Sequence, residues 1–324
     1  MAEVFTRRNL LGRSILLPAA VAALRSINVA AELPPIRRVG PARLRLGLNA
    51  YSFLEPLNAN LQDPSQGIDL FGVCDFCAAL ELEAVDLTGY FFPGYPDAPP
   101  IDYLYRLKRH CHSLGLGISG TGVRNDFTAA DKQVRAEGVR RIKTWVEVAA
   151  RLGAPAVRVF ADSQKPFSNW QAAAQGASRE TVEAWMADDL RACAEHGAEF
   201  GVLIAVQNHG DFIATGEQHL SLLKRVDHAW CAALVDTGKY LTAEPYADIS
   251  LVAPYAVNWQ IKETTGSNIK SPPTDFSRLV KIIRESRYRG YVPIETLRMG
   301  RKDYDPRTEV TKMVNALRAA IGEA

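Results

Sequence analysis

Short apolar, β-branched runs alternate with longer segments of helical hydrophobic period from residue 43 to the end of the chain. Such runs predict strands buried on both faces, and strands that alternate with helices pair in parallel through crossover connections. The sequence contains eight of these runs: Arg45–Asn49, Glu83–Asp86, Gly115–Gly120, Ala156–Phe160, Val202–Gln207, Ala232–Asp236, Ala256–Lys262 and Tyr291–Glu295.

The segments between the runs carry the signals of helix ends. The period through Ile142 and Trp145 ends at Gly153, a residue suited to a left-handed C-cap, and the last period follows Asp305 as N-cap with Pro306 in the first helical position. Eight strand–helix units predict a single closed (β/α)₈ TIM barrel. An open doubly wound sheet is the alternative, but no Gly-x-Gly-x-x-Gly follows the first strand and the sequence has no P-loop.

The N-terminus has the pattern of an export signal. Arg7-Arg8 follows a hydroxyl residue and precedes Leu-Leu, as in a twin-arginine (Tat) signal, and Ser14–Leu24 is apolar but shorter than the about 20 residues of a membrane span. We expect residues 1–31 to be a Tat-type signal peptide, residues 32–42 a linker and residues 43–324 the barrel. The mature protein is then periplasmic or extracellular, with no membrane span. A chance arginine pair before an amphipathic helix is the alternative.

Composition and charge exclude some classes of partner. The 324 residues carry a net charge of +2 and no run of like charges, so we expect no nucleic-acid partner and no membrane-surface role. A homo-oligomer stays open. The five cysteines are scattered, and Cys74 and Cys77 fall within an apolar helical period. We therefore expect both to be buried helix residues, with a redox pair as the alternative.

Polar side chains interrupt the strands that should be buried, chiefly at their C-terminal ends. Asn258, Gln260 and Lys262 share one face of the seventh strand, and Gln207 and His209 share a face at the end of the fifth. An unpartnered buried polar group costs about 1–3 kcal/mol, so these groups need each other or a ligand. Because catalytic groups of this fold lie at the C-terminal strand ends, we expect a site there. A satisfied hydrogen-bond network is the alternative.

Further polar residues near strand ends are candidates for substrate binding. They are Asn49, Tyr51, Asp86, Arg124, Asn125, Arg158, Asn208, Glu263 and Arg298. For Arg298 the choice lies between binding a hydroxyl or a phosphate and capping a helix. The aromatic loop from Tyr90 to Tyr95 suits the C–H faces of sugar rings, or else packs on its own barrel. The expected partner is a small carbohydrate.

Four motifs at the strand ends carry a family resemblance: Val206-Gln-Asn-His-Gly210, Val235-Asp-Thr-Gly238, Trp259-Gln-Ile-Lys-Glu263 and Pro293-Ile-Glu295. With them, residues 43–322 resemble the xylose-isomerase-like barrels of the sugar phosphate isomerase/epimerase group. The resemblance implies one divalent metal held by Glu, Asp, His and Glu, which here correspond to Gln207, Asp236, Gln260 and Glu295. This all-oxygen set suits Mn²⁺, Mg²⁺ or Ca²⁺, with weaker affinity because one carboxylate is lost.

The resemblance also implies a metal-assisted sugar isomerase or epimerase that acts through an enediolate. Glu295 is the expected base, and His209 and Lys262 are the other expected catalytic residues, because the amide of Gln207 takes no proton near neutral pH. Elimination or hydration of a 3-keto-glycoside on the same barrel is one alternative. A non-catalytic sugar-binding barrel is another, since two metal positions carry glutamine. An apurinic-site endonuclease is disfavoured, because such enzymes hold several metals with more histidines and carboxylates.

Overall fold

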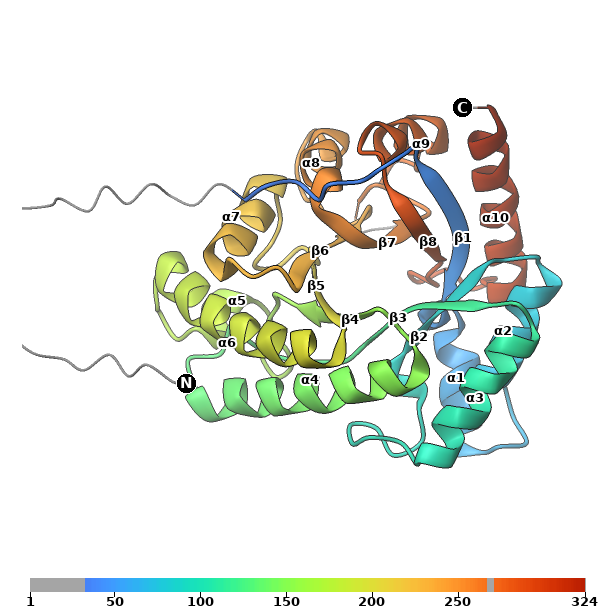
Figure 1. The fold of residues 1–324 in the computed structure, drawn as a ribbon, viewed down its shortest axis with the longest axis horizontal. Coiled ribbons are helices and arrows are strands. Elements are labelled where there is room, and N and C mark those ends of the chain that lie inside the picture. The colour runs from blue at the N-terminus through green and yellow to red at the C-terminus, as the bar shows by residue number, and fades with distance from the viewer. Residues whose placement is uncertain (1–32, 267–270, 324) are drawn as a thin grey trace, which may run out of the picture. The chain divides into compact units, whose positions relative to one another are not determined.

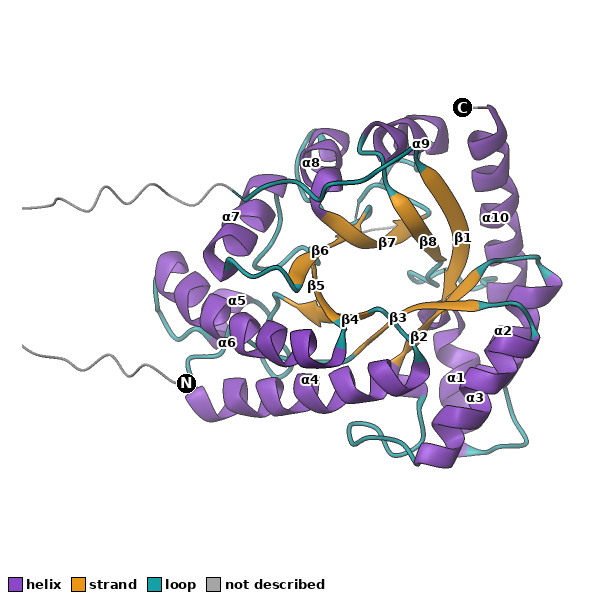
Figure 2. Ribbon diagram, in the orientation of Figure 1, coloured by secondary structure: helices purple, strands orange, loops and turns teal. Residues whose placement is uncertain are grey.

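The computed structural model describes residues 33–266 and 271–323. Its strands pair in parallel, each with the next along the chain, and the pairing of the first with the last closes a barrel. Figure 1 follows the chain around this ring, and Figure 2 shows the strands surrounded by helices. The strands are β1 (Arg43–Asn49), β2 (Ala84–Thr88), β3 (Gly117–Gly122), β4 (Ala156–Phe160), β5 (Leu203–Gln207), β6 (Cys231–Asp236), β7 (Ala256–Lys262) and β8 (Arg289–Glu295).

All eight predicted strands are present, so the (β/α)₈ TIM barrel is confirmed. The third strand begins and ends two residues later than predicted, at Gly117–Gly122 instead of Gly115–Gly120, and the second strand is also shifted towards the C-terminus, from Glu83–Asp86 to Ala84–Thr88. Gly115 has a φ of 72°, in the left-handed region that glycine tolerates. It therefore belongs to the turn before β3 rather than to the strand.

The helices lie outside the ring of strands (Figure 2). They are α1 (Leu54–Gln62), α2 (Leu70–Ala79), α3 (Ile101–Ser113), α4 (Lys132–Leu152), α5 (Trp170–Ala173), α6 (Arg179–Phe200), α7 (Gly216–Val226), α8 (Pro245–Val252), α9 (Phe276–Glu285) and α10 (Pro306–Glu323). The predicted caps are confirmed: Gly153 ends α4 with a φ of 82°, and the Asp305 carboxylate accepts from the Thr308 amide at 2.8 Å. Cys74 and Cys77 are buried in α2, as expected for helix-packing residues.

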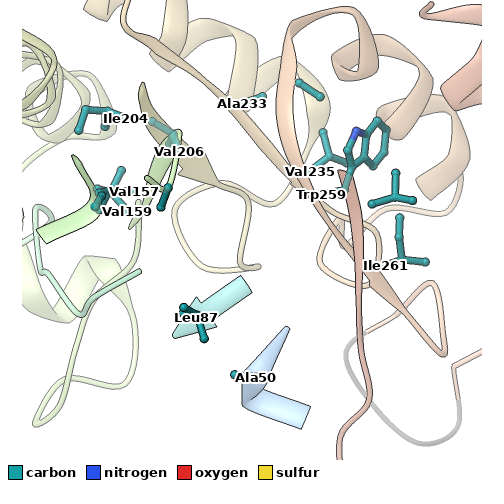
Figure 3. Packing of buried hydrophobic residues seen from close by; sticks show 14 of the residues in the cluster. Ala50, Leu87, Val157, Val159, Ile204, Val206, Ala233, Val235, Trp259 and Ile261 are labelled. Atoms are coloured by element: carbon teal, nitrogen blue, oxygen red, sulfur yellow. The ribbon is translucent and has the colours of Figure 1, made fainter. Parts of the chain in front are cut away.

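The main apolar core lies between the strands and the helices. Alternate strand residues such as Trp259 and Ile261 on β7 join it and are fully buried (Figure 3). The intervening residues point the other way, because successive side chains of a strand alternate between its faces. A small cluster of Ala156, Ala205 and Leu234 forms a separate apolar layer. This alternation leaves Gln260 and Lys262 on the face opposite to Trp259.

The predicted signal peptide, residues 1–31, lies outside the described residues. Residues 33–42 contain no helix or strand, and the Arg38 guanidinium in this segment donates to the carbonyl oxygens of Pro254 and Ser286, at 3.1 Å each. Among the helices of the described ranges, none combines the length and apolar character that crossing a membrane requires.

Trp145 supplies a test of the packing between α4 and the barrel. Its side chain is fully buried against Phe92 and Tyr95, and its indole N–H donates to the Pro96 carbonyl at 2.9 Å. Trp145→Ala is expected to lower the free energy of unfolding by about 3–5 kcal/mol in denaturant titrations, because it leaves a large cavity. Val134→Ala, on the same helix but 42% exposed, should change it by no more than about 0.5 kcal/mol. Equal losses in both variants would contradict this packing.

Candidate active site

A cavity of about 180 Å³ opens at the C-terminal ends of the strands. Strand ends converge there in a closed parallel barrel. The lining combines side chains from most of the strands: Asn49, Tyr51, Thr88, Tyr90, Arg124, Arg158, Phe160, Gln207, His209, Lys239, Gln260, Lys262, Glu295 and Leu297. The three predicted catalytic residues, Glu295, His209 and Lys262, therefore surround one opening.

Lys262, at the end of β7, bonds to the two buried carboxylates of the site. Its Nζ donates to Glu295 Oε1 at 2.5 Å and lies 3.5 Å from Asp236 Oδ2. All three side chains are 9% exposed or less. Burial alone lowers the pKa of the Lys262 ammonium, but the combined attraction of Asp236 and Glu295 outweighs burial and raises that pKa above its ordinary value. The amine therefore remains charged throughout the physiological range.

Gln207, at the end of β5, bonds to two of the other predicted metal ligands. Its Nε2 donates to Asp236 Oδ2 at 2.8 Å and to Gln260 Oε1 at 2.5 Å. The second oxygen of Asp236 accepts from the Gly238 amide at 3.0 Å. Gln207 Oε1 is buried without a hydrogen-bond partner. The four predicted ligands thus lie together, but mainly as donors and acceptors for one another and for Lys262.

This arrangement does not fit the Mn²⁺, Mg²⁺ or Ca²⁺ that the resemblance implies. Both carboxylates are paired with the Lys262 ammonium, and Gln207 presents an amide nitrogen, which is no ligand, to Asp236 and Gln260. Gln207 Oε1 has no hydrogen-bond partner and Lys262 donates to only one oxygen of Glu295, whereas hard divalent cations surround themselves with about six or more oxygens. Elsewhere in the described ranges, no three His, Cys, Asp or Glu side chains are grouped so as to hold a metal ion.

His209, just beyond β5, forms a pair with Asp162, which follows β4. Its Nδ1 lies 2.5 Å from Asp162 Oδ2, and its ring lies 4.8 Å from that of Phe160. The imidazole is 36% exposed, whereas the carboxylate is 7% exposed. Within the described ranges Nε2 has no protein partner, and the side chain lines the cavity. A carboxylate on one ring nitrogen fixes the tautomer and leaves the other free for proton transfer.

Two arginines line the cavity with no carboxylate within ion-pair distance in the described part of the chain. Arg158, on β4, is 7% exposed and donates to the Tyr90 hydroxyl at 2.7 Å and to the Val123 carbonyl at 2.9 Å. The Arg124 guanidinium lies 4.6 Å from the centre of the Tyr90 ring. Arg135, equally buried, is instead paired with Asp189 at 3.0 Å. Arg124 and Arg158 are therefore free to bind polar or negative substrate groups.

Five predicted substrate-binding residues do not line the cavity and bond to other protein groups. Asn208 exchanges hydrogen bonds with the backbone of Asp236 and Asn125 with that of Phe160. The others are Asp86, which lies behind Asn49; Glu263, which pairs with Arg301; and Arg298, which pairs with Glu55. Asn49, Tyr51, Arg124 and Arg158 do line it.

Some lining residues were not predicted. Phe160 shares a strand face with Arg158, but it is apolar, so a search for polar residues at strand ends does not select it. Lys239 follows the Asp-Thr-Gly motif directly, and Thr88 ends β2. Asp162 does not line the cavity, and no spacing in the sequence links it to His209, because the two follow different strands.

The chain belongs to the xylose isomerase-like TIM barrel family, whose model matches residues 74–320. The closed barrel and the polar strand ends agree with this assignment. No curated protein sequence matches the chain.

Several solved structures share the fold. D-psicose 3-epimerase from Clostridium cellulolyticum H10, solved with D-tagatose, superposes with a TM-score of 0.67 at 12% identity, over 86% of this chain and 99% of that one. 3-keto-D-glucoside 4-epimerase from E. coli superposes with a TM-score of 0.64 at 14% identity, over 86% of this chain and 100% of that one. The IolI protein, solved with a bound zinc atom, superposes with a TM-score of 0.64 at 13% identity, over 86% of this chain and 98% of that one. The chain is thus a distant structural relative of sugar epimerases, and at least one relative holds a divalent metal.

Asp86, buried below the cavity, makes stability depend on pH. Burial raises the pKa of Asp86 to about 6, against the opposing effects of the Asn258 hydrogen bond and the Arg158 charge. Because the folded pKa exceeds the unfolded one, the unfolded chain releases its proton first as pH rises, and the free energy of unfolding falls between about pH 4 and about pH 6. Asp86→Asn removes this dependence.

Denaturant titrations of both proteins at several pH values check this. From about pH 4 to about pH 7, the stability of the Asp86→Asn variant relative to the wild type should increase by up to about 3 kcal/mol. A relative stability that does not change with pH would contradict a raised pKa at Asp86.

Proposed function

We propose that this protein is a carbohydrate isomerase or epimerase that moves a proton at a carbon beside a carbonyl group. The observation that carries the proposal is the placement of two proton-transfer groups around one cavity. Glu295 lies on β8, and His209 with its partner Asp162 lies on the β4–β5 side. Enolate chemistry of this kind needs a base, an acid and a positive charge near the developing oxyanion.

Glu295 takes the carbon-bound proton in this proposal. Lys262 donates to one carboxylate oxygen of Glu295, so the other oxygen is available as a base. The electron pair of the broken C–H bond moves towards the carbonyl and forms an enediolate. Protonation of Glu295 removes one of the two negative charges beside Lys262. The Lys262 ammonium can then stabilise the negative charge of the enediolate. In an epimerisation a proton returns to the other face of the same carbon. In an isomerisation it returns to the adjacent carbon, and the hydroxyl proton moves from one enediolate oxygen to the other. Neither reaction needs a redox partner.

His209 is the second proton-transfer group. Gln207 occupies the position where the resemblance places a carboxylate, and an amide takes no proton near neutral pH. His209 shares the β5 side of the cavity with Gln207 and has a free Nε2. The rings of Tyr51, Tyr90 and Phe160 offer stacking surfaces for a sugar, and Arg124 and Arg158 offer donors for its oxygens.

Elimination from a 3-keto-glycoside is the second candidate, and the His209–Asp162 pair favours it. A histidine held by a carboxylate can protonate a leaving glycosidic oxygen after Glu295 has removed the neighbouring proton. A structure with this fold is a 3-keto-D-glucoside 4-epimerase, which acts on a substrate of that class. A sugar-binding barrel without catalysis predicts no proton exchange at all.

Hydrogen–deuterium exchange tests the catalytic proposal. In D₂O, a panel of ketoses and 3-keto-glycosides should include a substrate whose C–H signal disappears from the proton NMR spectrum when protein is added. Glu295→Gln should slow this exchange by about 100-fold or more. Glu285→Gln, on the exposed surface of α9, is the matched control and should exchange at the wild-type rate.

The outcomes distinguish the candidates. If Glu295→Gln exchanges at the wild-type rate, Glu295 is not the base. If the wild type forms an elimination product and His209→Gln still exchanges but no longer forms that product, the lyase replaces the isomerase. If no compound exchanges but some bind, the protein is a sugar-binding barrel.

Export is proposed from the Arg7-Arg8 pattern, with residues 32–42 as the linker to the barrel. In a host with a working twin-arginine pathway, the wild-type protein should accumulate outside the cytoplasm, and Arg7→Lys/Arg8→Lys should retain it inside. Fractionation followed by immunoblotting measures this. Equal export of both proteins would contradict a twin-arginine signal.

A further inference from the structure

The positive charge of this site is supplied by a side chain. We propose that the Lys262 ammonium takes the place of the divalent cation that the family resemblance implies, so that Asp236 and Glu295 form ion pairs with a lysine rather than bind a metal. The catalytic use of this ammonium rests on the proposed function. Its place between the carboxylates does not, and the two are tested separately.

The net charge of this site equals that of the metal site that the resemblance implies. The ligand set implied by the resemblance has three carboxylates around a dication, which leaves a net charge of −1. Here Asp236 and Glu295 surround the single charge of Lys262, which also leaves −1. Glutamine at position 207 removes the third carboxylate, and its amide nitrogen donates to Asp236, as no carboxylate could. A dication added to the present set would leave Lys262 as an excess positive charge.

The barrel is shaped to hold the lysine in this position. The Lys262 stem passes close to Gly238: a Cβ added at Gly238 would lie 2.9 Å from Lys262 Cγ and 3.0 Å from the Thr264 carbonyl oxygen. Glycine therefore leaves the space that the stem fills. The backbone amide of Lys262 is fixed by Thr237 Oγ1 at 2.9 Å. A metal could enter only if the buried ammonium gave up both carboxylates, and burial without a partner strongly disfavours a charge.

The ammonium keeps one donor for a ligand. It has three N–H groups, and the two carboxylates account for two of them. Lys262 also lines the cavity, so the third N–H is available to a substrate oxygen. A metal ion can hold two adjacent sugar oxygens, whereas this group offers one charge-assisted hydrogen bond. The site therefore suits a substrate presenting one carbonyl oxygen at Lys262.

Metal titration tests the proposal without a substrate. The full chain, freed of metal by a chelator, is titrated with Mn²⁺ and with Zn²⁺ in a calorimeter and followed by thermal unfolding. We expect that neither metal binds at a site that depends on Asp236, so the wild type and Asp236→Asn should give the same titration. We also expect no metal-dependent rise in the unfolding temperature. Binding of one metal per chain that is lost in Asp236→Asn would overturn the proposal.

A variant with the ligand set implied by the resemblance tests whether these residues prevent metal binding. The triple variant Gln207→Glu/Gln260→His/Lys262→Met restores three carboxylates and a histidine and removes the lysine charge. It should bind Mn²⁺ or Zn²⁺ at one per chain, at least about 100-fold more tightly than the wild type. Lys281→Met, which removes an exposed lysine of α9, is the matched control and should behave as the wild type. A folded triple variant that gains no binding would contradict the assignment of these three residues; if the variant does not fold, the wild-type titration still decides.

These results are independent of the proposed reaction. Absence of metal binding together with absence of proton exchange would support the inference and reject the proposed function. Metal binding at Asp236 together with proton exchange would reject the inference and support the proposed function.

Discussion

Closure of the sheet between β1 and β8 is the constraint on which the site depends. In a closed barrel the ends of all strands face one opening, so polar side chains from β5, β6, β7 and β8 come within hydrogen-bonding distance of each other. Water cannot solvate them there as it does at the surface, and charges in such a place need partners. The ion pairs of Lys262 with Asp236 and Glu295 meet this need, and Gln207 and Gln260 complete the network.

Strand register connects these ion pairs to the fold. Lys262 on β7 is the backbone partner of Glu295 on β8, and Asp236 on β6 is the partner of Gln260. Neighbouring residues in register place their side chains on the same face of the sheet. The charges therefore meet because the strands pair as they do. Glu295, Lys262 and His209 line one cavity, and the proposed proton transfer rests on this placement.

The barrel and the location of the site could be predicted from the sequence, because strand periodicity and polar strand ends are local signals. Gln207, Gln260, Lys262 and Glu295 were found in this way. Which groups bond to which could not be predicted. The contact of His209 with Asp162 joins two different strand ends, and Asn208 binds backbone rather than facing the cavity. Such choices depend on side-chain orientation, which spacing alone does not determine.

Anomalous diffraction from crystals grown with Mn²⁺ would locate a bound cation and the lysine in one experiment. We expect no anomalous peak between Asp236 and Glu295, with the Lys262 amine in clear density at that place. A peak bound by Gln207, Asp236, Gln260 and Glu295, with Lys262 turned away, would contradict this expectation.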